Sequence, residues 1–284
     1  KSFVRWLAGR GFDVFLLDWG APVKDEGMAS MDGVITERLI PAMEFAAKEA
    51  DGKIHAIGYC MGGTLLAAGA VLSPRVLQSA VFLASPWDFH AGDRTLATHI
   101  QAGAPVALQM IAQSGFLPAE WIQSVFAAIN AERTVTKFAG FSAQKNEGAV
   151  RIFIAVEDWL NEGIDLPAGV AQTCLHEWYG ANAPGRGSWV VDDVAIDLSA
   201  LDMPTLVVAS ERDRLVPAES SLAMAKILPK AESLAPSIGH GQDKAGDEEK
   251  SGLSDKHKAA VAAETEAGWA RAPVKEQDTT TSHS

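Results

Sequence analysis

Apolar and polar positions along the chain follow the pattern of alternating strands and helices. Four near-continuous apolar runs are typical of strands buried on both faces of a sheet. These runs cover residues 12–17, 53–58, 79–84 and 204–210. Segments with helical periodicity accompany them, at 3–10, 32–50, 61–72 and 218–228. Because parallel strands need crossover connections, this order predicts a mostly parallel α/β sheet with helices on both faces.

Two stretches break the alternation. Residues 86–197 hold five of the eight tryptophans and predict a largely helical insertion. Residues 241–284 are dominated by polar side chains and cannot bury enough surface to offset the entropy of ordering. We therefore predict a core formed by residues 1–85 and 198–240, a cap or lid formed by 86–197, and a disordered polar tail over 241–284.

Charge and composition exclude several classes of function. The chain carries 24 Lys and Arg against 36 Asp and Glu, a formal net charge of −12. Nucleic-acid binding and docking on anionic lipid both favour the opposite sign. Two cysteines cannot form a disulfide framework, and no apolar run has the length of a membrane span. The N-terminus lacks the features of a signal peptide, so we expect a cytoplasmic protein.

The sharpest chemical motif is GYCMGG at residues 58–63, which follows a predicted strand and opens a predicted helix. This context is typical of a nucleophile elbow with Cys60 in place of the usual serine. Positions 58 and 62 are expected to require a small residue, here Gly58 and Gly62, because side chains at these positions would collide. The helix N-terminus favours a thiolate, and the N–H of Met61 would face an oxyanion. The alternative is a buried cysteine in a glycine-rich turn of a nucleotide-binding fold.

A cysteine nucleophile needs an acid and a histidine, which follow it in that order in elbow proteins. Asp213 follows the strand predicted at 204–210, and His240 follows the last apolar stretch. The order Cys60, Asp213, His240 therefore fits a triad. Each of these residues has an alternative interpretation. Asp213 could be only a turn residue or the partner of a neighbouring arginine, and Glu211 could be the acid instead. His240 could be a surface residue. No metal-ligand spacing is present, so no metal or redox cofactor is expected.

Several motifs together resemble the poly(3-hydroxyalkanoate) synthases. They are LLDWG at 16–20, GYCMGGT at 58–64, ERDRLVP at 211–217 and GH at 239–240. The resemblance covers residues 1–240 and implies an α/β-hydrolase fold with a Cys–Asp–His triad. Carried over to this chain, Cys60 is the nucleophile, Asp213 the acid and His240 the base. Gly58, Gly62 and Gly63 belong to the elbow.

The resemblance also implies a reaction and its partners. The expected activity is acyl transfer that polymerises (R)-3-hydroxyacyl-CoA into polyester through a covalent thioester, releasing CoA without a further cofactor. It implies a homo-oligomer or a partner subunit, and a location at the polyester granule surface. Alternatives are a cysteine-dependent esterase or thioesterase resembling dienelactone hydrolases, and an inactive fragment or granule-binding relative.

The chain departs from the family pattern in three places. Arg214 follows the acid where relatives carry histidine, and a polar segment follows His240. The chain also begins at the helix that resembles the one before the fourth strand of the fold. This start predicts that the first strands, and the loop supplying a second oxyanion donor, are missing.

Overall fold

A computed structural model describes residues 2–129, 141, 146–161 and 163–237. The chain divides into two compact units: Lys1–Asp18 with Lys244–Ser284, and Trp19–Asp243. The predicted tail at 241–284 lies outside the described residues. The boundaries predicted for core, cap and tail remain predictions.

The larger unit is built on a four-stranded sheet in the order β1-β2-β7-β8, in which every neighbouring pair is parallel. The strands are β1 (Ile54–Tyr59), β2 (Leu77–Leu83), β7 (Thr205–Val208) and β8 (Ala231–Leu234). Their carboxyl ends stand in one row, because Tyr59 pairs with Leu83, Leu83 with Val208 and Val208 with Leu234. Parallel sheets gather their functional loops at this edge.

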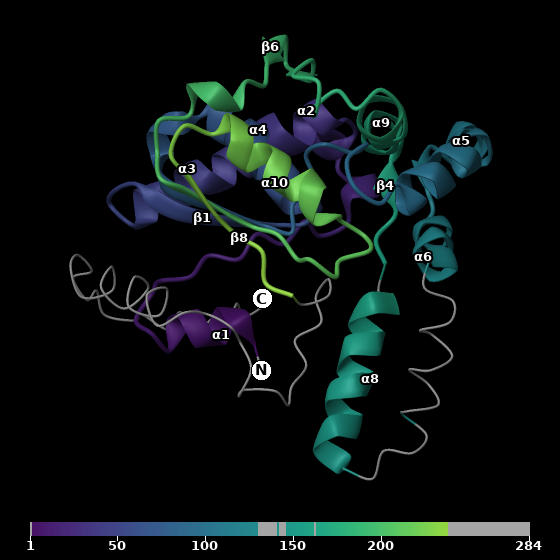
Figure 1. Ribbon diagram of the computed structural model, residues 1–284, viewed down its shortest axis with the longest axis horizontal. Helices are drawn as coiled ribbons and strands as arrows, with labels where there is room; N and C mark the ends of the chain where they lie inside the picture. Colours follow the sequence, from purple (N-terminus) through teal and green to yellow (C-terminus); the bar gives the residue numbers. More distant parts are fainter. Residues whose placement is uncertain (1, 130–140, 142–145, 162, 238–284) are drawn as a thin grey trace, which may run out of the picture. The chain divides into compact units, whose positions relative to one another are not determined.

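Helices connect the strands and bury one face of the sheet (Figure 1). Those of the sheet region are α2 (Met31–Gly33), α3 (Ile40–Glu49), α4 (Met61–Leu72) and α10 (Ala218–Ile227), with short turns η1 (Pro22–Lys24), η2 (Glu26–Met28), η4 (Pro74–Val76) and η6 (Leu198–Ala200). Phe82 and Val207 of the sheet are fully buried in one cluster with Leu66 of α4 and Met224 of α10. The predicted parallel α/β architecture is confirmed, although helices were expected on both faces and the described helices of this unit cover one.

The stretch between β2 and β7 is mainly helical, as predicted (Figure 1). It contains α5 (Thr95–Ser114), α6 (Ala119–Ile129), α8 (Glu147–Asn161), α9 (Ala168–Gln172) and the π-helix η5 (Thr173–Gly180). Two small antiparallel sheets lie in it, β3 (Phe116–Leu117) with β4 (Leu166–Pro167) and β5 (Val190–Val191) with β6 (Val194–Ala195). Trp87, Trp178 and Trp189 are buried and in ring contact. Burial of these rings accounts for three of the five tryptophans of this stretch.

The smaller unit differs from its prediction. Its helix α1 spans Phe3–Ala8, shorter than the predicted 3–10, and Gly11 adopts a φ of 90° after it. The apolar run 12–17 forms no strand, and Leu16 in it is 74% exposed. An apolar strand is stable only where neighbouring strands pair with it, and the described sheet is formed by other segments. The strand predicted at 12–17 is therefore wrong in this structure.

The helix predicted over 32–50 forms as α2, the π-helix η3 (Val34–Leu39) and α3 in succession. Pro41 lies at the start of α3, directly after the π-helix, so the hydrogen bond that its missing N–H cannot make falls at the junction of the two helices. The Ile40 N–H bonds the carbonyl of Ile35, five residues back. The π-helix thus lies where the proline interrupts the α-helical hydrogen bonding of this long helical segment.

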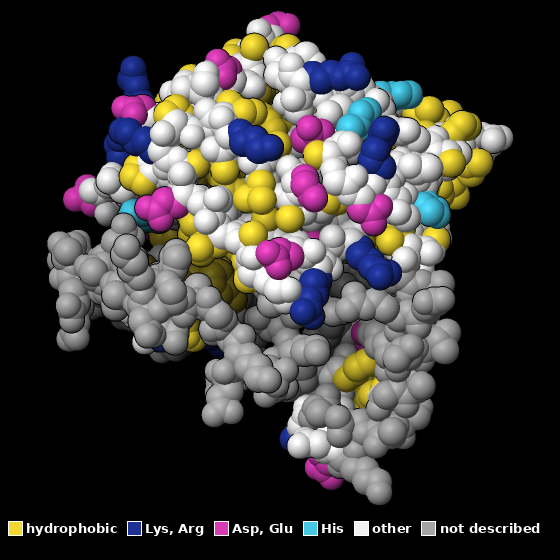
Figure 2. All heavy atoms as spheres, viewed as in Figure 1, with side chains coloured by type: hydrophobic (Ala, Val, Ile, Leu, Met, Phe, Trp, Pro, Cys, Tyr) yellow, Lys and Arg dark blue, Asp and Glu magenta, His cyan; other side chains and the backbone are white. Residues whose placement is uncertain are grey.

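The surface of the face drawn in Figure 2 carries side chains of both charges. Asp and Glu are interspersed with Lys and Arg among its described residues.

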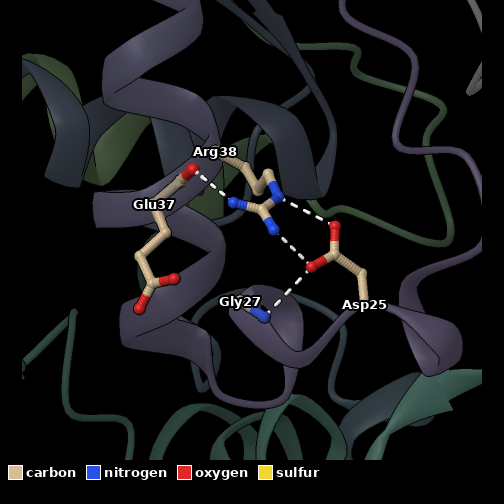
Figure 3. A network of polar contacts seen from close by, with 4 residues as sticks. All are labelled: Asp25, Gly27, Glu37 and Arg38. Carbon is tan, nitrogen blue, oxygen red and sulfur yellow. Dashed lines mark hydrogen bonds and ion pairs between the residues drawn. The ribbon is translucent and has the colours of Figure 1, made fainter.

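An ion pair ties the loop before α2 to the π-helix (Figure 3). The Nε and Nη2 atoms of Arg38 donate to the two carboxylate oxygens of Asp25, the former at 2.8 Å. Asp25 also accepts the Gly27 N–H at 3.0 Å, and Arg38 Nη1 donates to the Glu37 carbonyl at 2.7 Å. The hydrogen bond with Arg38 lowers the pKa of Asp25.

Candidate active site

Cys60 occupies a strained turn between β1 and α4. Its φ of 51° and ψ of −125° are unfavourable for a residue with a side chain. The Cys60 N–H donates to the Leu83 carbonyl of β2 at 2.9 Å, and its carbonyl accepts the Gly63 N–H at 2.9 Å. Met61 begins α4, so its N–H belongs to the first helical turn, which has no partners within the helix. This is the geometry of a nucleophile elbow.

The glycines of the motif differ in what a side chain at each position would contact. A Cβ on Gly58 would lie 2.4 Å from the Gly63 Cα, so a side chain at Gly58 is excluded as expected. A Cβ on Gly62 meets nothing within 4 Å, which makes the predicted collision at Gly62 wrong. A Cβ on Gly63 would lie 1.7 Å from the Oγ of Ser85. The close packing therefore involves Gly58 and Gly63, because the helix turns Gly62 away from the strand.

The segment after β2 lies directly against this turn. Ser85 is fully buried, and its hydroxyl donates to the carbonyls of Gly58 and Leu83 at 3.3 Å each. Thr64 of α4 donates its hydroxyl to the Pro86 carbonyl at 2.7 Å. These contacts fix the backbone on both sides of Cys60.

Asp213 lies in the turn that follows β7. It is 6% exposed, and its Oδ1 accepts the N–H groups of Leu215 at 2.8 Å and Val216 at 2.9 Å. Its own N–H donates to the Ser210 carbonyl. Glu211, the alternative acid, is exposed. Burial and the hydrogen-bonded turn make Asp213 the better candidate, because a rigid carboxylate orients a partner more firmly than an exposed one.

The structure brings Cys60 and Asp213 to the same end of the sheet. β1 and β7 flank β2, and their carboxyl ends are in register through Leu83. Tyr59 is influenced by both groups: burial, followed by the charges of Cys60 and Asp213, raises the pKa of Tyr59 to about 12. The two predicted residues therefore follow strands that end at the same edge of the sheet.

His240 lies outside the described residues. The chain leading to it can be followed as far as Ser237, whose hydroxyl accepts from the Nε of Arg212 at 3.0 Å. The Glu211 N–H donates to the Pro236 carbonyl at 3.1 Å. The last described residues before His240 thus lie beside the turn that contains Asp213.

The segment after β2 is also bonded to the end of η5. The side-chain oxygen of Asn182 accepts the Phe89 N–H at 2.9 Å, and its nitrogen donates to Asp88 at 2.8 Å. Asn182 is 6% exposed and has a φ of 55°, a conformation that asparagine tolerates better than most residues. This junction fixes the direction in which the chain leaves η5.

A pocket opens between the segment after β2, the start of α5, η5 and the turn after Asp213. It is small and partly open to solvent, and neither Cys60 nor Asp213 is among its lining residues. Phe89, Leu96, Tyr179 and Val216 provide much of its apolar lining, and Asp88 and Asp93 contribute carboxylates. Apolar walls with a few polar groups are typical of small-molecule sites.

Sequence reasoning did not assign Tyr179 to the site. Burial raises its pKa above the usual range, and Cys60 and Cys174 add to the shift. Cys174 packs against the main core, and burial raises its pKa to about 12, as is usual for a core thiol. A weak signal for Tyr179 was available, because it lies in a π-helix and such helices often mark functional sites.

Comparison with known proteins defines the class to which this site belongs. The family model described as the alpha/beta hydrolase fold matches residues 2–241. The chain therefore belongs to the α/β-hydrolase fold family. A monoacylglycerol lipase from Paleococcus ferrophilus shares the fold with a TM-score of 0.51 and 14% identity, over 93% of this chain and 87% of the lipase.

Relatives found by sequence similarity indicate a narrower class of protein than the fold does. The chain is 29% identical to the poly(3-hydroxyalkanoate) polymerase subunit PhaC of Haloferax mediterranei, over 81% of this chain and 47% of the relative. It is 25% identical to the PhaC subunit of Synechocystis, over 81% of this chain and 62% of that protein. The resemblance to these synthases is thus confirmed, and the chain spans about half to two thirds of their length.

Two features are absent from the described part of the chain. Within it, none of the helices has the length and apolar character needed to cross a membrane. The same residues contain no group of three or more His, Cys, Asp or Glu side chains placed to hold a metal ion.

Proposed function

We propose that the chain carries the acyl-transfer site of a polyester synthase, with Cys60 as nucleophile, Asp213 as acid and His240 as base. The observation that supports this most directly is the strained Cys60 turn at the same sheet edge as the buried Asp213. The similarity to poly(3-hydroxyalkanoate) polymerase subunits supports the choice of a hydroxyacyl-CoA as substrate.

The first half of the proposed reaction loads Cys60. His240, oriented by Asp213, accepts the thiol proton while the sulfur attacks the carbonyl carbon of a 3-hydroxyacyl-CoA. The N–H of Met61 stabilises the resulting oxyanion. The carbon–sulfur bond to CoA then breaks, and CoA leaves with the proton held by His240.

The second half extends the polymer. His240 accepts the proton of a 3-hydroxyl group, whose oxygen attacks the thioester carbonyl of an acyl chain. An ester forms, the carbon–sulfur bond breaks, and the released thiol regains its proton. Water must be kept from the thioester, because hydrolysis would give a free hydroxy acid instead.

The test is the intact mass of the chain after incubation with (R)-3-hydroxybutyryl-CoA. We expect a ladder of hydroxybutyryl adducts on the unchanged chain and none on Cys60→Ala. Cys174→Ala is the matched control and should behave as the unchanged chain, because Cys174 packs into the core.

Other results would contradict the proposal in different ways. Free 3-hydroxybutyrate with a single transient adduct would indicate an esterase or thioesterase. Adducts that persist in Cys60→Ala would exclude Cys60 as the nucleophile. Neither adduct nor free acid would indicate a chain that has no acyl-transfer activity by itself.

A further inference from the structure

Ser85 is a buried polar side chain beside the nucleophile turn, and the proposed reaction assigns it no role. It lies two residues after the end of β2 and is fully buried. Burying a hydroxyl is unfavourable unless it is hydrogen-bonded, and an alanine at this position would avoid that cost. The presence of a hydroxyl here therefore calls for an explanation.

The hydroxyl of Ser85 joins the ends of two neighbouring strands. It donates to the carbonyl of Gly58 in β1 and to the carbonyl of Leu83 in β2, at 3.3 Å each. The Leu83 carbonyl also accepts the Cys60 N–H at 2.9 Å. The hydroxyl is thus bonded both to the strand that precedes Cys60 and to the carbonyl that holds the backbone of Cys60 itself.

The same side chain packs against the helix that follows Cys60. Gly63 lies in the first turn of α4, and a Cβ on Gly63 would lie 2.5 Å from the Cβ of Ser85. Ser85 therefore lies against the residue two before Cys60, the residue three after it and the strand beside it. Contacts on these three sides restrict the position of the Cys60 turn.

The backbone next to Ser85 is bonded to the strand that leads to the acid. Ala84 has a φ of 46°, and its N–H donates at 2.7 Å to the carbonyl of Val208, the last residue of β7. The turn that contains Asp213 follows β7. A positive φ at a non-glycine residue persists only where the surroundings determine it. This short segment thus connects the Cys60 turn with β7.

We propose that Ser85 is a positioning residue of the acyl-transfer site, and this inference rests on the proposed function. Its contacts hold the Cys60 sulfur in place relative to the N–H of Met61 and to β7. Ser85 acts through the backbone, and no bond to it forms or breaks in the reaction. Both of its hydrogen bonds are longer than the usual value of about 2.8 Å, so the hydroxyl adds little to stability. Its loss should therefore affect reactivity more than folding.

The experiment compares Ser85→Ala with Ser221→Ala in the full chain. Both substitutions remove one hydroxyl from a fully buried serine. Ser221 lies in α10, and its hydroxyl has no hydrogen-bond partner within the described part of the chain. Ser221→Ala is therefore a matched control, which repeats the substitution and the burial without the contact to the Cys60 turn.

Four quantities are measured for the unchanged chain and both variants. Intact mass in single turnover gives the maximal rate and the half-saturating concentration for acylation by (R)-3-hydroxybutyryl-CoA. Thermal unfolding gives the midpoint of the fold. Amide hydrogen exchange at Cys60 reports on its hydrogen bond to Leu83.

We expect Ser85→Ala to lower the maximal acylation rate about 10-fold, because a misplacement of about 1 Å can reduce a rate on the order of 10²-fold. The half-saturating concentration should stay the same, and the Cys60 N–H should exchange faster. The thermal midpoint should fall by only a few degrees. Ser221→Ala should keep the acylation and exchange rates of the unchanged chain.

Several results would overturn the proposal. An unchanged maximal rate in Ser85→Ala would do so, even with faster exchange at Cys60. An equal fall in Ser221→Ala would indicate a general effect of losing a buried hydroxyl, and a change confined to the half-saturating concentration would indicate a role in substrate binding. If the unchanged chain is never acylated, the proposed function itself fails, and the role of Ser85 fails with it.

Discussion

Hydrogen bonds and close packing with neighbouring segments hold Cys60 in its unfavourable backbone conformation. Its N–H is bonded to β2, and Gly63 packs against Ser85, which in turn bonds the strand before the turn. Strain of about 1–3 kcal/mol persists only where the surroundings determine the conformation in this way. The close contact between Gly63 and Ser85 is thus part of what holds the thiol in place.

Substitutions at the two consecutive glycines should separate these effects. Gly63→Ala places a methyl group against buried Ser85 and should destabilise the fold by about 1–3 kcal/mol through overpacking. Gly62→Ala meets open space on a helix, where alanine is favoured over glycine, and should not destabilise. Denaturant unfolding measures both. Equal losses in the two variants would contradict this account.

Sequence reasoning at this scale identified the elbow but not its packing. The order of strand, GYCMGG and helix was sufficient to place Cys60 and Gly58. It predicted a collision for a side chain at Gly62, whereas the close contact is made by Gly63. The contact between Gly63 and Ser85 joins segments that are separate in the sequence, so the sequence pattern does not show it. Tyr179 was missed for the same reason, since its place in the pocket lining depends on how η5 packs.

At the scale of elements, the ion pair between Asp25 and Arg38 joins a loop to a π-helix. Both side chains are about one third exposed, so the pair contributes modestly to stability. The pKa of Asp25 is lowered and that of Arg38 is raised, chiefly by their mutual hydrogen bonds. The pair therefore favours the folded state while the carboxyl is ionised.

This pair predicts a pH-dependent effect of Arg38→Met. Because the pKa of Asp25 is lower in the folded state, its contribution is complete above the unfolded value of about 3.9 and is lost as the pH falls through the folded value. The variant should melt slightly below the unchanged chain at pH 6, and the difference should shrink below about pH 4. Thermal unfolding followed by circular dichroism tests this, and a difference that persists at pH 3 would contradict it.

Most elements were predictable from periodicity, and the exceptions have physical causes. The helix at Met61–Leu72 and the strands β1, β2 and β7 follow directly from their apolar patterns, whereas β8 has no apolar run of its own. The run at 12–17 has the composition of a buried strand, but composition alone supplies no pairing partner. The two π-helices have no apolar pattern that distinguishes them from α-helices in the sequence. Both lie within longer helical segments, and η3 lies directly before a proline.

At the scale of the whole molecule, charge affects the approach of substrate. The chain has a formal net charge of −12, and the described surface in Figure 2 shows both signs interspersed. The phosphates of a CoA thioester are also negative. Repulsion at long range should therefore slow their encounter at low ionic strength, because charges are screened over about 30 Å at 0.01 M salt but only about 8 Å at 0.15 M.

Added salt should consequently accelerate acylation by a CoA substrate. We expect the second-order rate constant for acylation of Cys60 by (R)-3-hydroxybutyryl-CoA to rise severalfold between 0.01 and 0.15 M salt. The uncharged N-acetylcysteamine thioester of the same acid is the control and should show little change. A fall in the CoA rate with salt would instead indicate a local cationic site for the phosphates.

The register of the sheet has a consequence for the order in which the chain folds. The turn of Cys60 is enclosed by β1, α4 and β2, which are consecutive in the sequence. Asp213 joins it only when Leu83 pairs with Val208, across the whole helical stretch between β2 and β7. Closing so long a loop is entropically unfavourable and slow. The nucleophile should therefore be structured early, and its acid should arrive in a later kinetic phase.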